Sequence, residues 1–142
     1  MTAFGYEIEI PVRYRDLDTY GHVNNANYAT YLEEARIAYF EDVLDLEQQA
    51  RGMVIASMSI DFREPIEADE VTVGLGVTRI GESSFDFEYE IEAGGQVVAA
   101  AESVQVAYDQ EHAQTIRFPD EWREAVQDFE DGQVLMSAEK TD

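Results

Sequence analysis

One long helical pattern, followed mainly by extended patterns, is the feature that most constrains the fold of this sequence. From about Asn25 to Leu44, apolar side chains recur every three or four residues, the spacing of a helix with one buried face. A helix of about five turns is long enough to be the central element of a domain. The apolar stripe consists of Tyr28, Tyr31, Leu32, Ala35, Tyr39 and Val43, and the charged residues Glu33, Glu34, Arg36, Glu41 and Asp42 fall mostly off it.

Extended segments lie on both sides of this helix. Apolar and polar residues alternate from Tyr6 to Val12, which predicts a half-buried first strand. The pair Gly94-Gly95 predicts a tight hairpin, and Pro119 favours the first position of a short helix. Four more extended segments are expected at Met53–Arg63, Val71–Ile80, Phe85–Ile91 and Val97–Tyr108. These elements predict an α+β fold with an antiparallel sheet of about five strands curved around one helix.

The chain of 142 residues is long enough for one hydrophobic core, so a single domain over residues 1–142 is expected. Residues 132–142 are weakly patterned, and we expect them to form a mobile tail. An open sheet leaves an edge strand to be covered, which favours a homodimer or a homotetramer built from two dimers. No apolar run reaches the roughly 18 residues that span a bilayer. We therefore expect a soluble cytoplasmic protein with no membrane partner.

The charge balance is extreme. Asp and Glu number 31 against nine Lys and Arg, and the formal net charge is -22. Nucleic acid is therefore not an expected partner. Self-repulsion of this size weakens the compact state in dilute buffer and is screened at molar salt, where the Debye length falls to about 3 Å. The composition indicates adaptation to the salt-rich cytoplasm of a halophile.

A polar loop runs from Asp16 to Tyr28, straight into the long helix. It places carboxylates beside a helix N-terminus, whose free N–H groups polarise a carbonyl or bind an anion. That combination suits acyl transfer from a thioester. The same residues resemble the start of a calcium-binding loop. However, Tyr20 stands where that loop needs an oxygen ligand, and Asn27 stands where it needs a bidentate Glu. No dinucleotide, serine-hydrolase or zinc motif is present in the sequence.

The segment Tyr14-Arg-Asp-Leu-Asp-Thr-Tyr-Gly-His-Val-Asn-Asn-Ala-Asn-Tyr28, with Tyr31-Leu-Glu-Glu-Ala-Arg36 after it, resembles a known signature. It is similar to that of the 4-hydroxybenzoyl-CoA thioesterase-like family of hot-dog acyl-CoA thioesterases. The motif covers about a fifth of the chain, and the expected strand order is compatible along nearly all of it. The resemblance implies a hot-dog fold and hydrolysis of an acyl-CoA to a carboxylic acid and free coenzyme A.

Position by position, the resemblance puts the catalytic carboxylate on Asp18 and the amide that polarises the thioester carbonyl on Asn25. Asp18 acts either as a nucleophile on that carbonyl or as the general base for a water. A lone Asp would more often form a turn or a helix cap, and it is the motif that favours the catalytic role for Asp18. Asn24 is expected to cap the helix while it serves the site, and His22 to fix the loop rather than to act as a base.

The remaining site predictions concern the substrate. Tyr28 is expected in the core or the pocket wall, and Glu33 is a second choice for the catalytic carboxylate. The phosphates of coenzyme A need cations, which are scarce here. The resemblance points to the turn between the third and fourth strands, with Arg79 as a phosphate ligand beside Ser83 and Ser84. Arg63 is a weaker candidate, and a surface ion pair is the alternative for each arginine.

The sequence thus favours an acyl-CoA thioesterase that needs no metal or redox cofactor, with coenzyme A as part of its substrate. Two alternatives remain open. One is hydrolysis of acyl-carrier-protein thioesters, which is disfavoured because an acidic carrier would meet an acidic surface. The other is a non-catalytic module that binds acyl groups or acyl-CoA.

Overall fold

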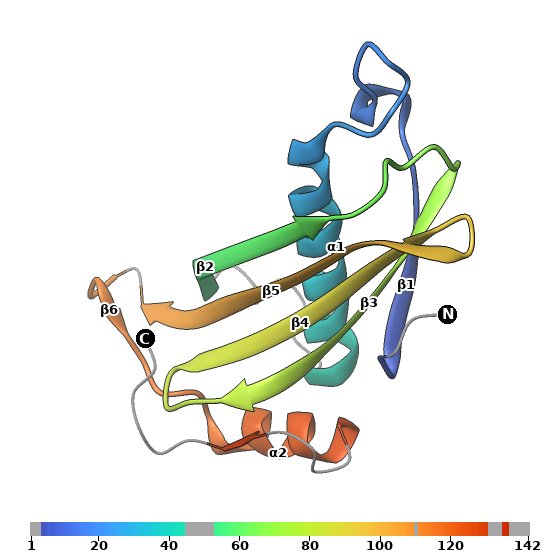
Figure 1. Cartoon of the computed structure of the whole chain (residues 1–142). Coiled ribbons are helices and arrows are strands. Elements are labelled where there is room, and N and C mark those ends of the chain that lie inside the picture. Colours follow the sequence, from blue (N-terminus) through green and yellow to red (C-terminus); the bar gives the residue numbers. More distant parts are fainter. Residues whose placement is uncertain (1–3, 45–52, 110, 131–134, 137–142) are drawn as a thin grey trace.

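A curved, mainly antiparallel sheet wraps around helix α1 (Asn25–Leu44) in the computed structural model, which describes residues 4–44, 53–109, 111–130 and 135–136 (Figure 1). This arrangement is the hot-dog fold, and the predicted α+β class is confirmed. The main path through the sheet has the order β1-β3-β4-β5-β2 with antiparallel neighbours. Its strands are β1 (Tyr6–Pro11), β3 (Glu70–Ile80), β4 (Ser84–Ala93), β5 (Gln96–Asp109) and β2 (Met53–Phe62).

Short elements complete the fold. A 3-10 helix spans Tyr14–Asp16, β6 (Gln114–Thr115) pairs with β5, and helix α2 (Asp120–Phe129) follows Pro119. Within the predicted tail, only β7 (Leu135–Met136) belongs to the described residues, and it pairs in parallel with β3. The rest of that tail lies outside them.

The core lies between α1 and the inner face of the sheet. Alternate residues of β4 are buried there, and the ring of Phe87 packs edge-on against Tyr39 of α1 at 5.3 Å between centroids. The apolar stripe predicted for α1 is buried from Tyr28 to Tyr39. Arg36 is the exception to the sequence expectation, because it is buried with only 5% of its surface exposed. It stands four residues after Leu32 and three before Tyr39, which is the spacing of the inner face.

The turn between β4 and β5 has the conformation that its glycines predict. Gly94 and Gly95 adopt φ angles of 60° and 83°, a backbone region that strongly favours glycine over residues with a Cβ. Two successive positive φ angles characterise the hairpin turn whose twist matches that of the flanking strands. This turn fixes the register of β4 against β5.

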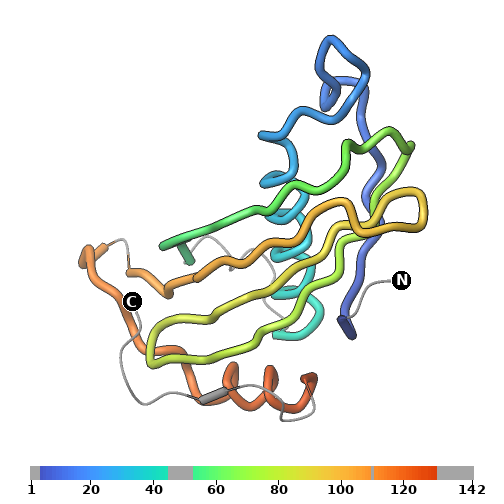
Figure 2. Tube along the Cα trace, in the orientation of Figure 1, coloured from blue at the N-terminus to red at the C-terminus, as the bar shows by residue number. Residues whose placement is uncertain are grey.

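The two ends of α1 have different surroundings, as the chain trace shows (Figure 2). The loop before α1 rises above its start, whereas α2 lies at the opposite end beside the turn that joins β3 and β4. The carboxylate of Glu130, just after α2, accepts hydrogen bonds from Val77 N at 3.0 Å and from the Tyr39 hydroxyl at 2.5 Å. Gly76 permits this close approach, since a Cβ there would lie 3.2 Å from the Glu130 carboxylate.

Strand β2 forms one edge of the main path. Its pairing in the described residues is with β5 alone. Apolar side chains on it are exposed, including Val54, Ile55 and Phe62 at 38%, 44% and 45%. An edge strand with exposed apolar side chains offers both backbone hydrogen bonds and apolar area to another chain.

Candidate functional site

The loop before α1 is built around the buried carboxylate of Asp16. One oxygen of this carboxylate accepts hydrogen bonds from Arg13 N at 3.0 Å, Arg13 Nε at 3.2 Å and the Tyr31 hydroxyl at 2.8 Å. Burial would raise the pKa of Asp16, but these donors outweigh it and hold the pKa below its ordinary value. The backbone carbonyl of Asp16 also accepts from Asn24 N and from the side-chain amide of Asn27. Asp16 therefore fixes the loop to the helix.

Asp18 has a different environment, although it lies only two residues further on. Its Oδ1 accepts hydrogen bonds from the backbone N–H groups of Tyr20 at 2.8 Å and His22 at 3.2 Å. Its own N–H and carbonyl bond to His22 O and Gly21 N, which closes a tight turn. The residue is half-buried, and Oδ2 has no hydrogen-bond partner in the described part of the chain. The turn thus holds one carboxylate oxygen and leaves the other available.

A surface pocket of about 520 Å³ lies beside this turn. Asp18 lines it together with Arg15 and Tyr14, and Tyr14 is 92% exposed. Arg15 has no ion-pair partner among the residues that the structure describes, in contrast to Arg13, which contacts Asp16 and Glu34. A carboxylate and an unpaired cation thus share one open pocket.

The start of α1 supplies the second half of the predicted chemistry. Asn24 caps the helix, because its side-chain oxygen accepts a hydrogen bond from Ala26 N at 2.9 Å and its carbonyl accepts from Asn27 N. The backbone N–H of Asn25, the first helical residue, has no acceptor in the described ranges. Such orphan N–H groups carry the positive end of the helix dipole and suit an oxyanion.

His22 contacts a different carboxylate from the one at the turn. Its Nε2 lies 2.8 Å from Oε2 of Glu67, and both side chains are partly exposed. Only the backbone of His22 engages Asp18. This geometry suits the fixing of the loop to the segment before β3, and it does not present the imidazole as a base for Asp18 or for a water beside it.

Two predicted site residues lie on α1 itself. Tyr28 is buried, its hydroxyl donates to Glu64 O at 3.3 Å, and its ring packs edge-on against Phe62. Burial raises the pKa of Tyr28, so its hydroxyl stays protonated at neutral pH. Glu33 is exposed and lies at the rim of a second pocket, between α1 and β2.

The predicted phosphate site lies at the other end of the molecule. The β3–β4 turn, with Ser83 and Ser84, is next to α2 and far from the loop of Asp18 (Figure 1). Both serines are buried, with 5% and 0% exposed. Arg79 pairs with Asp86 at 3.6 Å, and although burial raises the pKa of Asp86, the guanidinium opposes that rise. One chain therefore does not bring these residues together with Asp18.

Arg123 of α2 holds the β3–β4 turn against that helix. Its guanidinium donates to the backbone carbonyls of Gly81 at 2.6 Å and Glu82 at 3.0 Å. Burial lowers the pKa of Arg123, an effect that its neighbours Asp120 and Glu82 oppose. By contrast, the remaining predicted cation, Arg63, is half exposed beside Asp61 at 3.4 Å, and the backbone next to it accepts the hydrogen bond from Tyr28.

Sequence reasoning missed two arginines. Arg15 stands in the motif without a predicted role at the substrate, yet it lines the pocket beside Asp18. Arg36 is expected off the buried face, yet its helical spacing from Leu32 and Tyr39 was a signal that it faces inward. Neither residue has a spacing that by itself marks a ligand.

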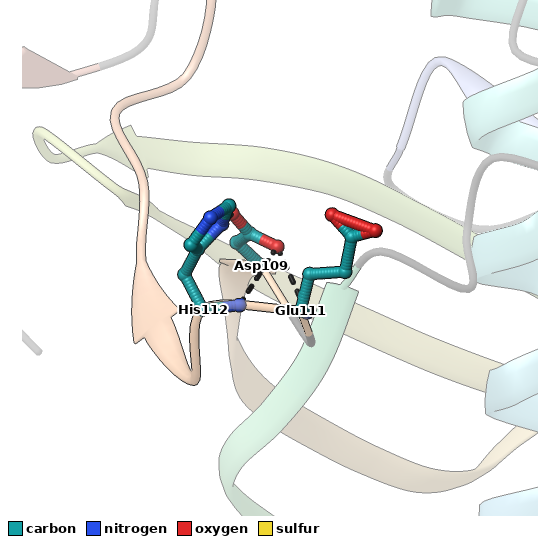
Figure 3. Close-up of side chains that lie close together, drawn as sticks. All are labelled: Asp109, Glu111 and His112. Atoms are coloured by element: carbon teal, nitrogen blue, oxygen red, sulfur yellow. Dashed lines mark hydrogen bonds and ion pairs between the residues drawn. The ribbon is translucent and has the colours of Figure 1, made fainter.

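A further cluster of potential metal ligands lies on the hairpin between β5 and β6. The ligand atoms of Asp109, Glu111 and His112 lie within 4.8 Å of one another (Figure 3). Contacts within the turn account for this grouping, because Asp109 accepts from the N–H groups of Glu111 and His112 and contacts the ring of His112 at 2.6 Å. His112 lowers the pKa of the Asp109 carboxylate.

Comparison with known proteins decides the family. The model of the thioesterase-like superfamily matches residues 12–126, which include the loop, α1 and every long strand except β1. The chain belongs to the thioesterase-like superfamily. It is accordingly a thioester hydrolase, and the prediction that it is an enzyme of this class is confirmed.

Individual relatives agree with this membership. The chain is 30% identical to the long-chain acyl-CoA thioesterase FadM of Escherichia coli K12 over 127 residues, 85% of this chain and 96% of the relative. It is 34% identical to a thioesterase from Thermus thermophilus solved with coenzyme A and zinc, with a TM-score of 0.84 over 92% and 98% of the two chains.

A third comparison concerns the fold alone. A 1,4-dihydroxy-2-naphthoyl-CoA thioesterase from Synechocystis is 23% identical, with a TM-score of 0.77 over 87% of this chain and 96% of its own.

Within the described residues, none of the helices is long and apolar enough to cross a membrane.

Proposed function

We propose that the protein is an acyl-CoA thioesterase in which Asp18 is the catalytic carboxylate and the N–H of Asn25 polarises the thioester carbonyl. The observation that carries the proposal is the contrast within Asp18: the turn holds Oδ1, whereas Oδ2 has no partner in the described chain and the residue lines an open pocket. Preorganised donors and a fixed carboxylate need little rearrangement when the reaction occurs. The similarity to an acyl-CoA thioesterase of Escherichia coli supports the substrate class.

As a general base, Asp18 accepts a proton from water while the water oxygen attacks the carbonyl carbon. The oxygen of the tetrahedral intermediate accepts a hydrogen bond from Asn25 N–H. The carbon–sulfur bond then breaks, and the thiolate of coenzyme A takes the proton from Asp18. The products are the carboxylic acid and the free thiol. No step in this route requires a metal or a redox cofactor.

As a nucleophile, Asp18 instead attacks the carbonyl carbon itself and expels the thiolate, which leaves a mixed anhydride that water hydrolyses. A single turnover in water labelled with oxygen-18 distinguishes the general-base route from a nucleophilic route in which water attacks the aspartyl carbon of the anhydride. The general-base route puts the label in the product acid. The nucleophilic route with attack on the aspartyl carbon puts it in Asp18, which mass spectrometry of the protein detects.

The nucleotide part of coenzyme A needs cations and an aromatic surface. Arg15, which has no ion-pair partner in the described part of the chain, supplies a cation in the pocket of Asp18, and the exposed ring of Tyr14 supplies a face on which adenine stacks. We therefore assign these two residues to the nucleotide. Arg63 and Arg79 remain competing candidates, each with an acidic partner to displace.

A dimer is proposed through the edge of β2. The exposed side chains of Val54, Ile55 and Phe62 and the unpaired edge are both covered if β2 of a second copy adds to the sheet. Light scattering after gel filtration in molar KCl measures the assembly. We expect a dimer or a tetramer of dimers, and Ile55→Lys should shift the protein toward monomer. A monomeric wild type would contradict the proposal.

The acidic composition is proposed to be an adaptation to a salt-rich cytoplasm. With a net charge of -22, screening by salt should stabilise the folded state. The midpoint of thermal unfolding should therefore rise steadily as KCl increases from 0.1 M toward about 3 M, the range over which the Debye length falls from about 10 Å to below 3 Å. A midpoint that does not change with salt would contradict this adaptation.

The decisive experiment measures thiol release from a panel of acyl-CoAs in molar KCl, comparing wild type with Asp18→Asn. Loss of the catalytic carboxylate should lower kcat by roughly 100-fold to 10,000-fold. Asp128→Asn, the same change on an exposed residue of α2, is the matched control. Acyl-carrier-protein thioesters form a second arm. Binding of acyl-CoA without hydrolysis by the wild type would instead identify a binding module.

A further inference from the structure

A buried arginine on the central helix has no counterion among the residues that the structure describes. Arg36 is 5% exposed, and its Nη1 donates a hydrogen bond to the Tyr89 hydroxyl at 3.2 Å. The Tyr89 hydroxyl lies 2.5 Å from Ser103 Oγ, which donates to Gln105 Oε1 at 3.3 Å. All four side chains are buried. This is a polar chain in the interior whose only charged member is a cation.

The absence of a carboxylate beside Arg36 stands out in so acidic a chain. No Asp or Glu lies within ion-pairing distance of it in the described part of the protein, although acidic residues outnumber basic ones by 31 to nine. A buried charge that lacks an opposite partner is strongly unfavourable. Four other arginines each have such a partner: Arg13, Arg63, Arg79 and Arg117.

Arg36 also borders a cavity. A pocket of about 560 Å³ lies between α1, β2 and β5, a size typical of small-molecule sites. Its polar lining includes Arg36 and Gln105, and Phe40, Met53 and Ile55 belong to its apolar wall. Because Gln105 accepts from Ser103 through Oε1, its amide hydrogens remain available to an acceptor in the pocket.

Glu33 does not neutralise Arg36. The two residues are three apart on α1, yet they form no ion pair, and Glu33 is exposed at the rim of the pocket. Solvent screens a charge at that position. The interior of the pocket therefore presents a guanidinium and an amide donor within an otherwise largely apolar wall.

We propose that this pocket receives acyl groups that carry a carboxylate at the end away from the thioester, and that Arg36 and Gln105 bind that carboxylate. The inference rests on the function proposed above and names the substrate class. The planar guanidinium matches a carboxylate with two parallel hydrogen bonds. Arg36 lies 11 residues after Asn25, roughly 16 Å along the helix axis, so the useful chain length is an experimental variable.

The test compares ω-carboxyacyl-CoAs with straight acyl-CoAs of equal length, from about 4 to 14 carbons, on the full chain in molar KCl. The readout is the ratio of kcat/KM between the acid-ended and the methyl-ended substrate. We expect this ratio to exceed one for at least one length. Arg36→Met should lower it by roughly 10-fold to 100-fold, the effect of one hydrogen bond to a charged group. Arg36→Lys should retain part of the ratio, because it keeps the charge and loses the fork.

Arg117→Met is the matched control, since it removes an exposed arginine that pairs with Asp120 near α2. Circular dichroism establishes that each variant is folded. A wild-type ratio below one at every length overturns the inference without any variant, and so does an unchanged ratio in folded Arg36→Met. Failure of the wild type to hydrolyse either series would instead overturn the proposed acyl-CoA thioesterase activity.

Discussion

The loop before α1 and the turn between β3 and β4 are both polar segments fixed by an arginine, but only the first leaves functional groups open. Arg13 holds the carboxylate of Asp16 in the loop, and Arg123 holds the carbonyls of Gly81 and Glu82 in the turn. The loop presents Asp18 to a pocket, whereas α2 covers the turn. Both turns are thus anchored by an arginine, but whether the turn is accessible to a ligand depends on which element packs over it. The residues of the turn do not specify that element.

Among the variants that test this difference between the loop and the turn, Asp16→Asn should have the largest effect on stability. The change removes a buried charge that accepts from Arg13 and Tyr31, so the free energy of unfolding should fall by about 2–4 kcal/mol. Asp18→Asn should cost less than about 1 kcal/mol, because its carboxylate is only half-buried. Denaturant unfolding in molar KCl measures both. Equal losses of unfolding free energy in the two variants would contradict the assignment of a structural role to Asp16 and a catalytic role to Asp18.

The stabilisation that Asp16→Asn removes should also depend on pH. The folded structure holds the pKa of Asp16 below its ordinary value of 3.8, so its contribution is complete above that value and is lost as the pH falls through the folded-state pKa. The difference in unfolding free energy between wild type and Asp16→Asn should therefore be constant near neutral pH and narrow below about pH 4. A difference that persists unchanged at pH 2 would contradict this assignment.

Much of the fold was predictable because its signals are local. The stripe from Tyr28 to Tyr39 and the pair Gly94-Gly95 each specify structure through residues close in sequence. The role of the Asn24 side chain as a helix cap is local in the same way. The start of α1 at Asn25 was predicted from the sequence in the same way, whereas the catalytic roles of Asp18 and Asn25 rest on the family resemblance and stay predictions.

The remaining parts depend on tertiary packing. Ser84 is buried at the β3–β4 turn, and Arg123 of α2, which donates to the carbonyl of Gly81 there, follows the turn by about 40 residues and gives no local signal of its target. Arg36 was misplaced because a charged side chain is expected outside, whereas Tyr89 on β4 supplies its hydrogen-bond partner. Pairings between distant elements of this kind are not encoded in periodicity.

Arg123→Met should have the next largest effect, at the closed end. It removes two hydrogen bonds to the carbonyls of Gly81 and Glu82, and we expect a loss of about 2 kcal/mol in unfolding free energy. The KM for acyl-CoA should change little if the turn is structural. A large rise in KM in a variant that remains folded would show that the β3–β4 turn contacts the substrate.

Arg15 in the loop and Arg79 on β3 offer a direct choice between the two regions as the site of the nucleotide. Arg15→Gln should raise the KM for acyl-CoA by roughly tenfold, the effect of one charge-assisted hydrogen bond to phosphate. Arg79→Gln should raise it less, because Arg79 already faces Asp86. Steady-state kinetics at two salt concentrations checks both, since a phosphate contact weakens as salt increases. The reverse order would move the nucleotide to the β3–β4 turn.

A smaller loss of stability than that of Asp16→Asn should come from Gly21→Ala, which tests how rigidly the loop holds Asp18. Gly21 has a φ of +80° and an open surrounding, so a methyl group meets no neighbour and the cost is the backbone conformation alone. That cost is about 1–2 kcal/mol for a residue with a Cβ. If the turn relaxes, Tyr20 N and His22 N move away from Oδ1. The fold-decrease in kcat should then exceed the fold-decrease in the folding equilibrium constant. A loss of stability with unchanged kcat would mean that catalysis does not require the geometry of this turn.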